Sequence, residues 1–159
     1  MSKDITLSEL QEFIAGFWYH YDEAHYDELA ARYAQDVRYV TRSDSGASPF
    51  EELMSPELRH RDAVTKWLSD HRKQSPYPLR HHATNVHRIG TNGEVTRARF
   101  YIFVNQIANF VPFAVSSGVA NVGVRRGANG LEFTDMDIVL DTTNSVLLSE
   151  FTADSATVS

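Results

Sequence analysis

Apolar positions in the first third of the chain recur every three or four residues, which is the spacing of one helical face. The residues that follow it are Leu7, Leu10, Ile14, Phe17 and Tyr21. They predict an amphipathic helix over residues 6–23. Thr6 and Glu9 have the spacing of a capping box, which places the start of the helix at this point.

Two more helices are predicted at residues 26–35 and 58–72, because apolar residues again gather on one side of each segment. Between them, the β-rich run at 37–41 predicts a strand. Residues 42–56 are rich in Ser, Gly and Pro and predict a loop.

The pattern changes to that of strands from residue 79 onward. The predicted strands span 79–90, 94–106, 110–125 and 131–141. The Asn92-Gly93 pair predicts a tight turn between the first two strands, and Gly127 to Gly130 predicts one between the last two. This segment has no room for the helical crossovers that a parallel sheet requires.

The predicted fold class is therefore α+β. We expect a cone-shaped α+β barrel in which three N-terminal helices cover the concave face of a curved, mainly antiparallel sheet. A single domain should span residues 1–151. The small, polar residues 152–159 are expected to form a flexible tail.

Composition narrows the possible functions. The chain has 159 residues, 15 basic and 21 acidic, and the net charge of −6 argues against nucleic acid as a partner. No apolar stretch approaches the ~20 residues of a membrane helix, and the N-terminus lacks the apolar region of a signal peptide. Cysteine is absent, which excludes disulfides, thiol nucleophiles and thiolate metal sites and suits a cytoplasmic protein.

A bent sheet covered by helices encloses a concave apolar space, so polar residues at inward positions are candidates for binding a small molecule. Asp22 follows Trp18 by one helical turn, so its carboxylate lies either at a pocket mouth or in solvent at the helix end. His81 and His82 are neighbours on a predicted strand and must face opposite sides. One of them therefore faces the interior. That histidine is either a functional group in the cavity or a hydrogen-bonded packing residue.

Two asparagines lie on apolar strand faces. Asn105 shares a face with Tyr101 and Phe103, and Asn121 shares one with Val119. A buried amide costs free energy unless it is paired. Each asparagine is therefore expected to bond either a ligand or a neighbouring backbone group.

If Tyr101 and Phe103 point inward, the alternate residues on the same strand point outward. These are Phe100, Ile102 and Val104. An exposed apolar sheet face usually needs a partner, so we expect a homodimer or homotrimer.

A carboxylate, an imidazole and two amides together would suit proton abstraction beside a carbonyl. The spacing of His81, His82 and His87 does not fit a zinc site, and no dinucleotide, phosphate-loop or serine-hydrolase motif is present. We therefore expect no metal and no cofactor.

Three segments carry a resemblance to a known family. They are YDEAHYDEL at 21–29, DVRY at 36–39 and RHHATNV at 80–86. They resemble nuclear transport factor 2-like proteins of the SnoaL type, most closely the branch that contains scytalone dehydratase and bile-acid dehydratases. The resemblance extends over about residues 6–145.

The resemblance implies roles for particular residues. Tyr21 and Asp22 match the tyrosine–aspartate pair of scytalone dehydratase, His81 matches its first catalytic histidine, and Asn121 matches its pocket asparagine.

Two positions depart from the scytalone dehydratase pattern. Thr41 stands where the resemblance expects a second tyrosine, and Asn105 stands where it expects a second histidine. These changes remove a phenol that would polarise the carbonyl and one proton carrier. Scytalone itself is therefore not expected as the substrate.

A second resemblance competes with the first. Residues 36–39, 80–86 and DIVLD at 137–141 are also similar to β-subunits of aromatic-ring-hydroxylating dioxygenases. Those share the cone-shaped fold but are structural, because the metal and cluster lie in the partner subunit. A non-catalytic small-molecule binding protein is a further alternative.

The function that the sequence favours is a dehydratase-like lyase or isomerase acting on a small cyclic or aromatic substrate. The expected catalytic residues are His81 as base, Asp22 as its orienting partner and Tyr21 as a hydrogen-bond donor. The expected substrate-binding residues are Asn105, Asn121, Trp18 and Tyr101.

Overall fold

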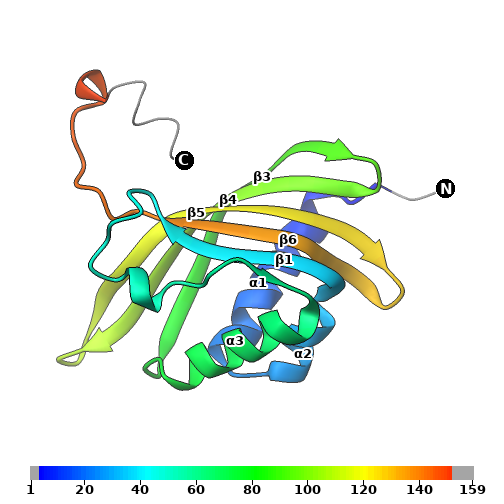
Figure 1. The fold of residues 1–159 in the computed structure, drawn as a ribbon, viewed down its shortest axis with the longest axis horizontal. Coiled ribbons are helices and arrows are strands. Elements are labelled where there is room, and N and C mark those ends of the chain that lie inside the picture. The colour runs from blue at the N-terminus through cyan, green and yellow to red at the C-terminus, as the bar shows by residue number, and fades with distance from the viewer. Residues whose placement is uncertain (1–3, 152–159) are drawn as a thin grey trace.

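Three helices lie against one face of a curved six-stranded sheet in the computed structural model (Figure 1). The structure describes residues 4–151, so the predicted tail at 152–159 lies outside the described residues. The helices are α1 (Leu7–Asp22), α2 (Tyr26–Ala31) and α3 (Arg61–Lys73). Short 3₁₀ turns occur at Glu51–Leu53 and Leu148–Glu150.

The strands run in the spatial order β2-β1-β6-β5-β4-β3. Their bounds are β1 (Tyr33–Ser43), β2 (Leu58–Arg59), β3 (Leu79–Asn92), β4 (Val95–Ala108), β5 (Val111–Gly127) and β6 (Gly130–Leu140). Among the strand pairs of the described chain, β1–β6 is parallel and the others are antiparallel. The mainly antiparallel α+β prediction is confirmed, but the sheet keeps β2 and β3 as open edges and does not close into a barrel.

Two predicted helix boundaries are wrong. The second helix ends at Ala31 instead of residue 35, because Tyr33 already pairs with Phe133 of β6 and begins β1. The third begins at Arg61, because Leu58 and Arg59 pair with β1 as the short strand β2. Local apolar spacing does not register these pairings, which depend on a distant strand.

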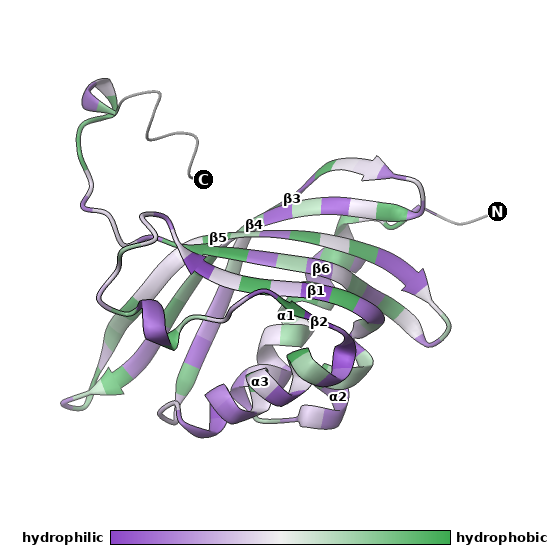
Figure 2. Ribbon diagram, in the orientation of Figure 1, coloured by the Kyte–Doolittle hydropathy of each residue, from purple (hydrophilic) through white to green (hydrophobic). Residues whose placement is uncertain are grey.

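Helix α1 supplies much of the core. Its N-terminus has the predicted capping box, in which the Thr6 hydroxyl accepts from the Glu9 amide and the Glu9 carboxylate accepts from the Thr6 amide. Its apolar stripe is buried under the sheet, with Leu10, Ile14 and Phe17 fully enclosed. Polar and apolar residues alternate along the strands above it (Figure 2).

The two faces of β4 are the reverse of the prediction. Phe100, Ile102 and Val104 are buried under the helices, whereas Tyr101 and Phe103 are 54% and 43% exposed on the other face. Successive residues of a strand point to opposite faces, and on β4 both faces carry large apolar residues. The alternation therefore does not show which face the helices cover.

No helix in the described part of the chain is long and apolar enough to cross a membrane.

Candidate functional site

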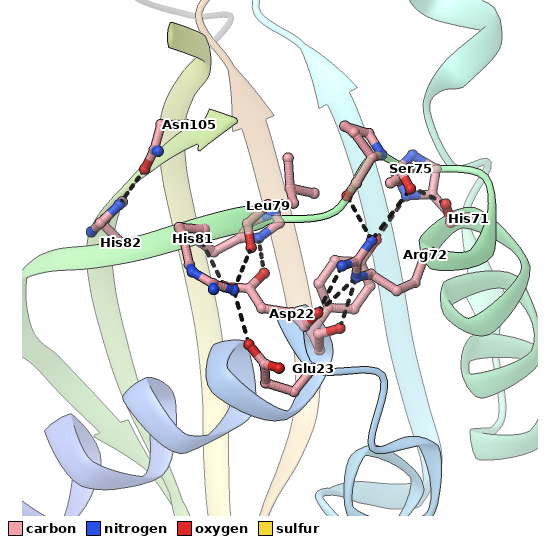
Figure 3. A network of polar contacts seen from close by, with 12 residues as sticks. Asp22, Glu23, His71, Arg72, Ser75, Leu79, His81, His82 and Asn105 are labelled. Carbon is pink, nitrogen blue, oxygen red and sulfur yellow. Dashed lines mark hydrogen bonds and ion pairs between the residues drawn. The ribbon is translucent and has the colours of Figure 1, made fainter. Parts of the chain in front are cut away.

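The last residue of α1 and the third residue of β3 form a buried pair at the site (Figure 3). Oδ1 of Asp22 lies 2.6 Å from Nδ1 of His81, and Oδ2 of Asp22 accepts the backbone N–H of His81 at 2.9 Å. Asp22 is only 5% exposed. The carboxylate is therefore buried, and neither a pocket-mouth nor a solvated position describes it.

The carboxylate sets the tautomer of His81. An ionised carboxylate only accepts hydrogen bonds, so Nδ1 carries the proton and Nε2 of the neutral ring keeps its lone pair. Nε2 makes no hydrogen bond with any residue between 4 and 151, and the His81 side chain is 11% exposed. The pair thus holds one ring nitrogen and leaves the other available as a base.

Two aromatic side chains of α1 fix the plane of the imidazole. The ring of Trp18 stacks on His81 with centroids 4.6 Å apart and planes 7° apart. The ring of Tyr21 meets His81 edge-on at 5.1 Å and 90°. Within the described chain, the indole N–H of Trp18 is buried without a hydrogen-bond acceptor, so this wall of the site carries an unused donor.

Arg72 of α3 holds the end of α1 in place. Its Nε and Nη2 atoms donate to the carbonyl of Asp22 at 3.1 and 2.7 Å, and Nε also donates to the carbonyl of Tyr21. Nη1 donates to the carbonyl of Pro76 at 3.1 Å. A buried guanidinium therefore satisfies helix-terminal carbonyls that would otherwise lack donors, and it positions the Asp22 backbone.

A second imidazole lies beside Tyr21. Nδ1 of His71, on α3, lies 2.8 Å from the Tyr21 hydroxyl, and its ring stacks on Trp67 at 4.8 Å. Burial is the main cause that lowers the pKa of His71, and the positive charge of Arg72 nearby lowers it further. Burial is also the main cause that raises the pKa of Tyr21. Both groups are therefore neutral near pH 7.

Tyr39 brings another phenol to the same interior. It is buried on β1, its hydroxyl accepts from Thr41 Oγ1 at 2.9 Å, and burial raises its pKa to about 12. Thr41 is the position at which the family resemblance expects a tyrosine. Tyr39 lies two residues earlier on the same strand face and was missed, although alternation along 39–41 could have identified it.

The two asparagines and Tyr101 do not reach this interior, which corrects the prediction. Asn105 Oδ1 bonds His82 Nε2 at 2.7 Å on the outer side of β3 and β4, away from the Asp22–His81 pair (Figure 3). Asn121 Oδ1 accepts from Arg99 Nε at 2.6 Å, also on the outer face. These residues alternate with the buried set that faces inward, which consists of Ala98, Phe100, Ile102 and Val104 on β4 and Ala120, Val122 and Val124 on β5.

Four of the seven predicted site residues therefore come together: Trp18, Tyr21, Asp22 and His81. His81 and His82 face opposite sides as predicted. Tyr39 and His71 are additions from the structure. Among residues 4–151, no group of three or more His, Asp or Glu side chains is placed to hold a metal ion.

Two surface hollows of about 200 and 260 Å³ lie away from His81, one against the β3–β4 turn and one between α2 and the β5–β6 turn. Beyond the helices, the inner face of the β4–β5 hairpin continues uncovered. Phe113 pairs there with Gln106, next to Leu79 of β3, and is 56% exposed. The apolar inner surface of the sheet therefore continues past the helices onto this hairpin.

The chain belongs to the SnoaL-like domain family, whose model matches residues 6–137. The matched segment contains both members of the Asp22–His81 pair. Among curated protein sequences, none matches the chain significantly.

Solved structures share the fold. ActVI-ORFA from Streptomyces coelicolor is 19% identical with a TM-score of 0.69, covering 86% of this chain and 97% of its own. The β-subunit of benzoate 1,2-dioxygenase from Burkholderia mallei is 17% identical with a TM-score of 0.68, covering 87% and 92%. A nuclear transport factor 2-like protein with a cystatin-like fold from Novosphingobium aromaticivorans is 15% identical with a TM-score of 0.69, covering 95% and 86%. At these identities the similarity shows the fold alone.

Proposed function

We propose that the protein is a cofactor-free lyase or isomerase of dehydratase type that acts on a small cyclic or aromatic carbonyl compound. The observation that carries the proposal is the buried Asp22–His81 pair, in which Oδ1 and Nδ1 are 2.6 Å apart and Nε2 has no hydrogen-bond partner among the described residues. Histidine is the side chain best suited to exchange protons near neutral pH.

The proposed reaction begins when Nε2 of His81 removes a proton from the carbon next to the carbonyl. The C–H electron pair moves toward the carbonyl oxygen and forms an enolate, while Asp22 stabilises the imidazolium that results. In an elimination, the enolate collapses, the bond to a β-hydroxyl breaks, and the imidazolium returns its proton to the departing oxygen as water. In an isomerisation, the proton returns to another carbon of the same substrate.

Tyr21 is proposed to donate a hydrogen bond to the developing oxyanion, because its ring contacts His81 and its raised pKa keeps the phenol protonated. The indole N–H of Trp18 is a second donor on the same wall. A donor of this kind contributes about 2.7–4 kcal/mol in a site that excludes water.

The alternative is a structural role like that of a dioxygenase β-subunit, which the similarity to the benzoate dioxygenase subunit supports. The Asp22–His81 pair would then only join the end of α1 to the start of β3. A third alternative is a non-catalytic protein that binds a small molecule in the same interior. The two alternatives predict no turnover in the isolated chain.

The test uses a panel of cyclic and aromatic β-hydroxy ketones, with loss of water followed by the absorbance of the conjugated product. His81→Ala should reduce the rate to background. The matched control is His82→Ala, which alters the neighbouring residue on the opposite face and should leave the rate within about twofold. Equal rates in the two variants, or no turnover of any panel member, would reject the catalytic proposal.

We also propose that the chain forms a homodimer or homotrimer through the outer sheet face. Tyr101 and Phe103 are large apolar side chains on that face and are largely exposed. The sequence predicts Phe100, Ile102 and Val104 on this face, but the structure buries them under the helices.

A further inference from the structure

We propose that His71 and Tyr21 act as one hydrogen-bond donor unit for the substrate oxygen. In this arrangement Nδ1–H of His71 donates to the oxygen of Tyr21, so that the phenol proton is directed to the substrate. The inference rests on the proposed function, and it assigns to α3 a positioning residue for that reaction.

The geometry links the two imidazoles through one phenol. The Tyr21 hydroxyl lies 2.8 Å from His71 Nδ1, and the Tyr21 ring packs edge-on against His81 at 5.1 Å. Tyr21 is 2% exposed, so water does not compete freely for its hydroxyl. The donor unit and the base are therefore adjacent in one buried cluster.

The His71 ring is held as firmly as the His81 ring. It stacks on Trp67 with centroids 4.8 Å apart and planes 17° apart, as His81 stacks on Trp18. Trp67 in turn contacts the ring of Tyr39 at 5.8 Å. A phenol that must point at a developing charge benefits from a partner that cannot rotate away, because the arrangement then needs no reorganisation during the reaction.

The charges of the cluster favour a neutral His71. Burial is the main cause that lowers its pKa, and the positive charge of Arg72 nearby opposes its protonation further. A neutral imidazole donates from only one nitrogen. When that nitrogen is Nδ1, the oxygen of Tyr21 acts as acceptor, and its proton is left for a ligand or for the Ser75 side chain, which also lies within hydrogen-bond reach. In the other tautomer Nδ1 carries no proton, so the Tyr21 hydroxyl would donate its proton to His71 instead of to a ligand.

The donor unit also defines the ligand chemistry. Arg72 directs its donors to backbone carbonyls, so no basic side chain is offered to the ligand by this part of the site. The donors are an uncharged phenol and an uncharged imidazole behind it. This suits a carbonyl oxygen that gains charge only transiently, and it does not suit a carboxylate or phosphate.

The experiment measures binding of 4-nitrophenol to the full-length chain by visible absorbance, because its phenolate oxygen, like that of an enolate, carries a partial negative charge next to an sp² carbon. His71→Ala should weaken phenolate binding about tenfold. His71→Asn places an amide N–H near the position of Nδ1 and should restore binding to within about threefold. His71→Gln places its amide near Nε2 and should behave like His71→Ala.

Tyr21→Phe provides the coupling control. It should weaken binding, and His71→Ala added to it should have no further effect, since His71 acts through the phenol. Circular dichroism and urea unfolding of each variant check that it is folded. The inference is overturned if the wild-type chain does not bind the phenolate, if Asn and Gln at position 71 are equivalent, or if the two substitutions are additive.

Failure of the donor unit can be distinguished from failure of the proposed function. If phenolate binding depends on His71 and Tyr21 in both the wild type and His81→Ala, the donor unit stands even when no ketone is turned over. If His81→Ala abolishes turnover while His71→Asn and His71→Gln bind the phenolate equally, the base stands and the donor unit falls.

Discussion

At the scale of single residues, the site depends on one carboxylate whose two oxygens bond different groups of the same histidine. Asp22 Oδ2 holds the backbone of His81, and Oδ1 holds its ring. The first contact fixes where β3 begins relative to α1, and the second fixes the tautomer. An amide can replace the carboxylate in the first contact but not in the second. A substitution by asparagine therefore distinguishes the structural role of Asp22 from its proposed catalytic role.

Asp22→Asn should therefore retain the fold and lose the reaction. Its carbonyl oxygen can still accept the His81 backbone N–H, but its NH₂ group would donate to Nδ1 and move the ring proton to Nε2. We expect the kcat of a panel substrate to fall roughly 10²–10⁴-fold with little change in KM. Steady-state kinetics measures the effect, and a kcat within a few-fold of wild type would contradict it.

Arg72→Met should show what holds the dyad in place. The change removes several charge-assisted hydrogen bonds to buried carbonyls, and leaving such groups unpaired costs about 1–3 kcal/mol each. The free energy of unfolding, measured in urea, should fall by about 2–4 kcal/mol. Arg59→Met, which alters an exposed ion pair with Glu57, is the control and should change stability by less than about 1 kcal/mol. Equal losses in both variants would contradict this role.

At the scale of elements, α1 has a structural start and a functional end. Its N-terminus is fixed by the Thr6–Glu9 capping box and by Arg126, which donates to Glu9 at 2.8 Å. Its last two turns carry Trp18, Tyr21 and Asp22. Successive residues are rotated by about 100° around the helix axis. The residue at which the helix begins therefore also sets the direction in which these side chains face.

Acid titration of the capping box is a test of this element. Hydrogen bonds from the Thr6 amide, Arg126 and the Thr6 hydroxyl lower the pKa of Glu9 from 4.5 to about 2. A depressed folded-state pKa means that the Glu9 contribution to stability is present above pH 4.5 and is lost as the pH falls toward 2. In low salt, the wild type should be more stable than Glu9→Gln at pH 6, and the difference should shrink by pH 3. A constant difference would contradict the assignment.

The sequence predicts those parts of the fold and the site that have local signals. The capping box and apolar stripe identify α1, and strand alternation separates His81 from His82. The inner face of β4 was predicted wrongly, because Tyr101 and Phe103 are as apolar as Phe100 and Ile102. His71 lies on a helix face chosen by packing against β1, so no motif distinguishes it.

At the scale of the whole molecule, one sheet face is covered by the helices and the other is not (Figure 1). The inner face holds the polar cluster. The outer face carries Tyr101 and Phe103 beside the Arg99–Asn121 and His82–Asn105 contacts. An apolar centre with polar groups around it is typical of a protein interface.

Sedimentation should accordingly give a dimer or trimer at micromolar concentration. A chain with both Tyr101→Glu and Phe103→Glu should sediment as a monomer, because buried carboxylates on an apolar interface are costly. Phe50→Glu, which alters an exposed loop residue, should leave assembly unchanged. A monomeric wild type would contradict the proposed interface. Recovery only with a larger, iron-containing subunit would favour the β-subunit alternative.

The central claim is that His81 removes a proton from carbon, and deuterium incorporation tests it most directly. The chain is incubated in D₂O with the β-hydroxy ketone panel and with the matching ketones that lack a leaving group, and exchange next to the carbonyl is followed by proton NMR. The account predicts protein-dependent exchange that falls to background in His81→Ala, falls roughly 10²–10⁴-fold in Asp22→Asn and persists in His82→Ala. Exchange that is absent from the wild type, or that survives in His81→Ala, would contradict the account.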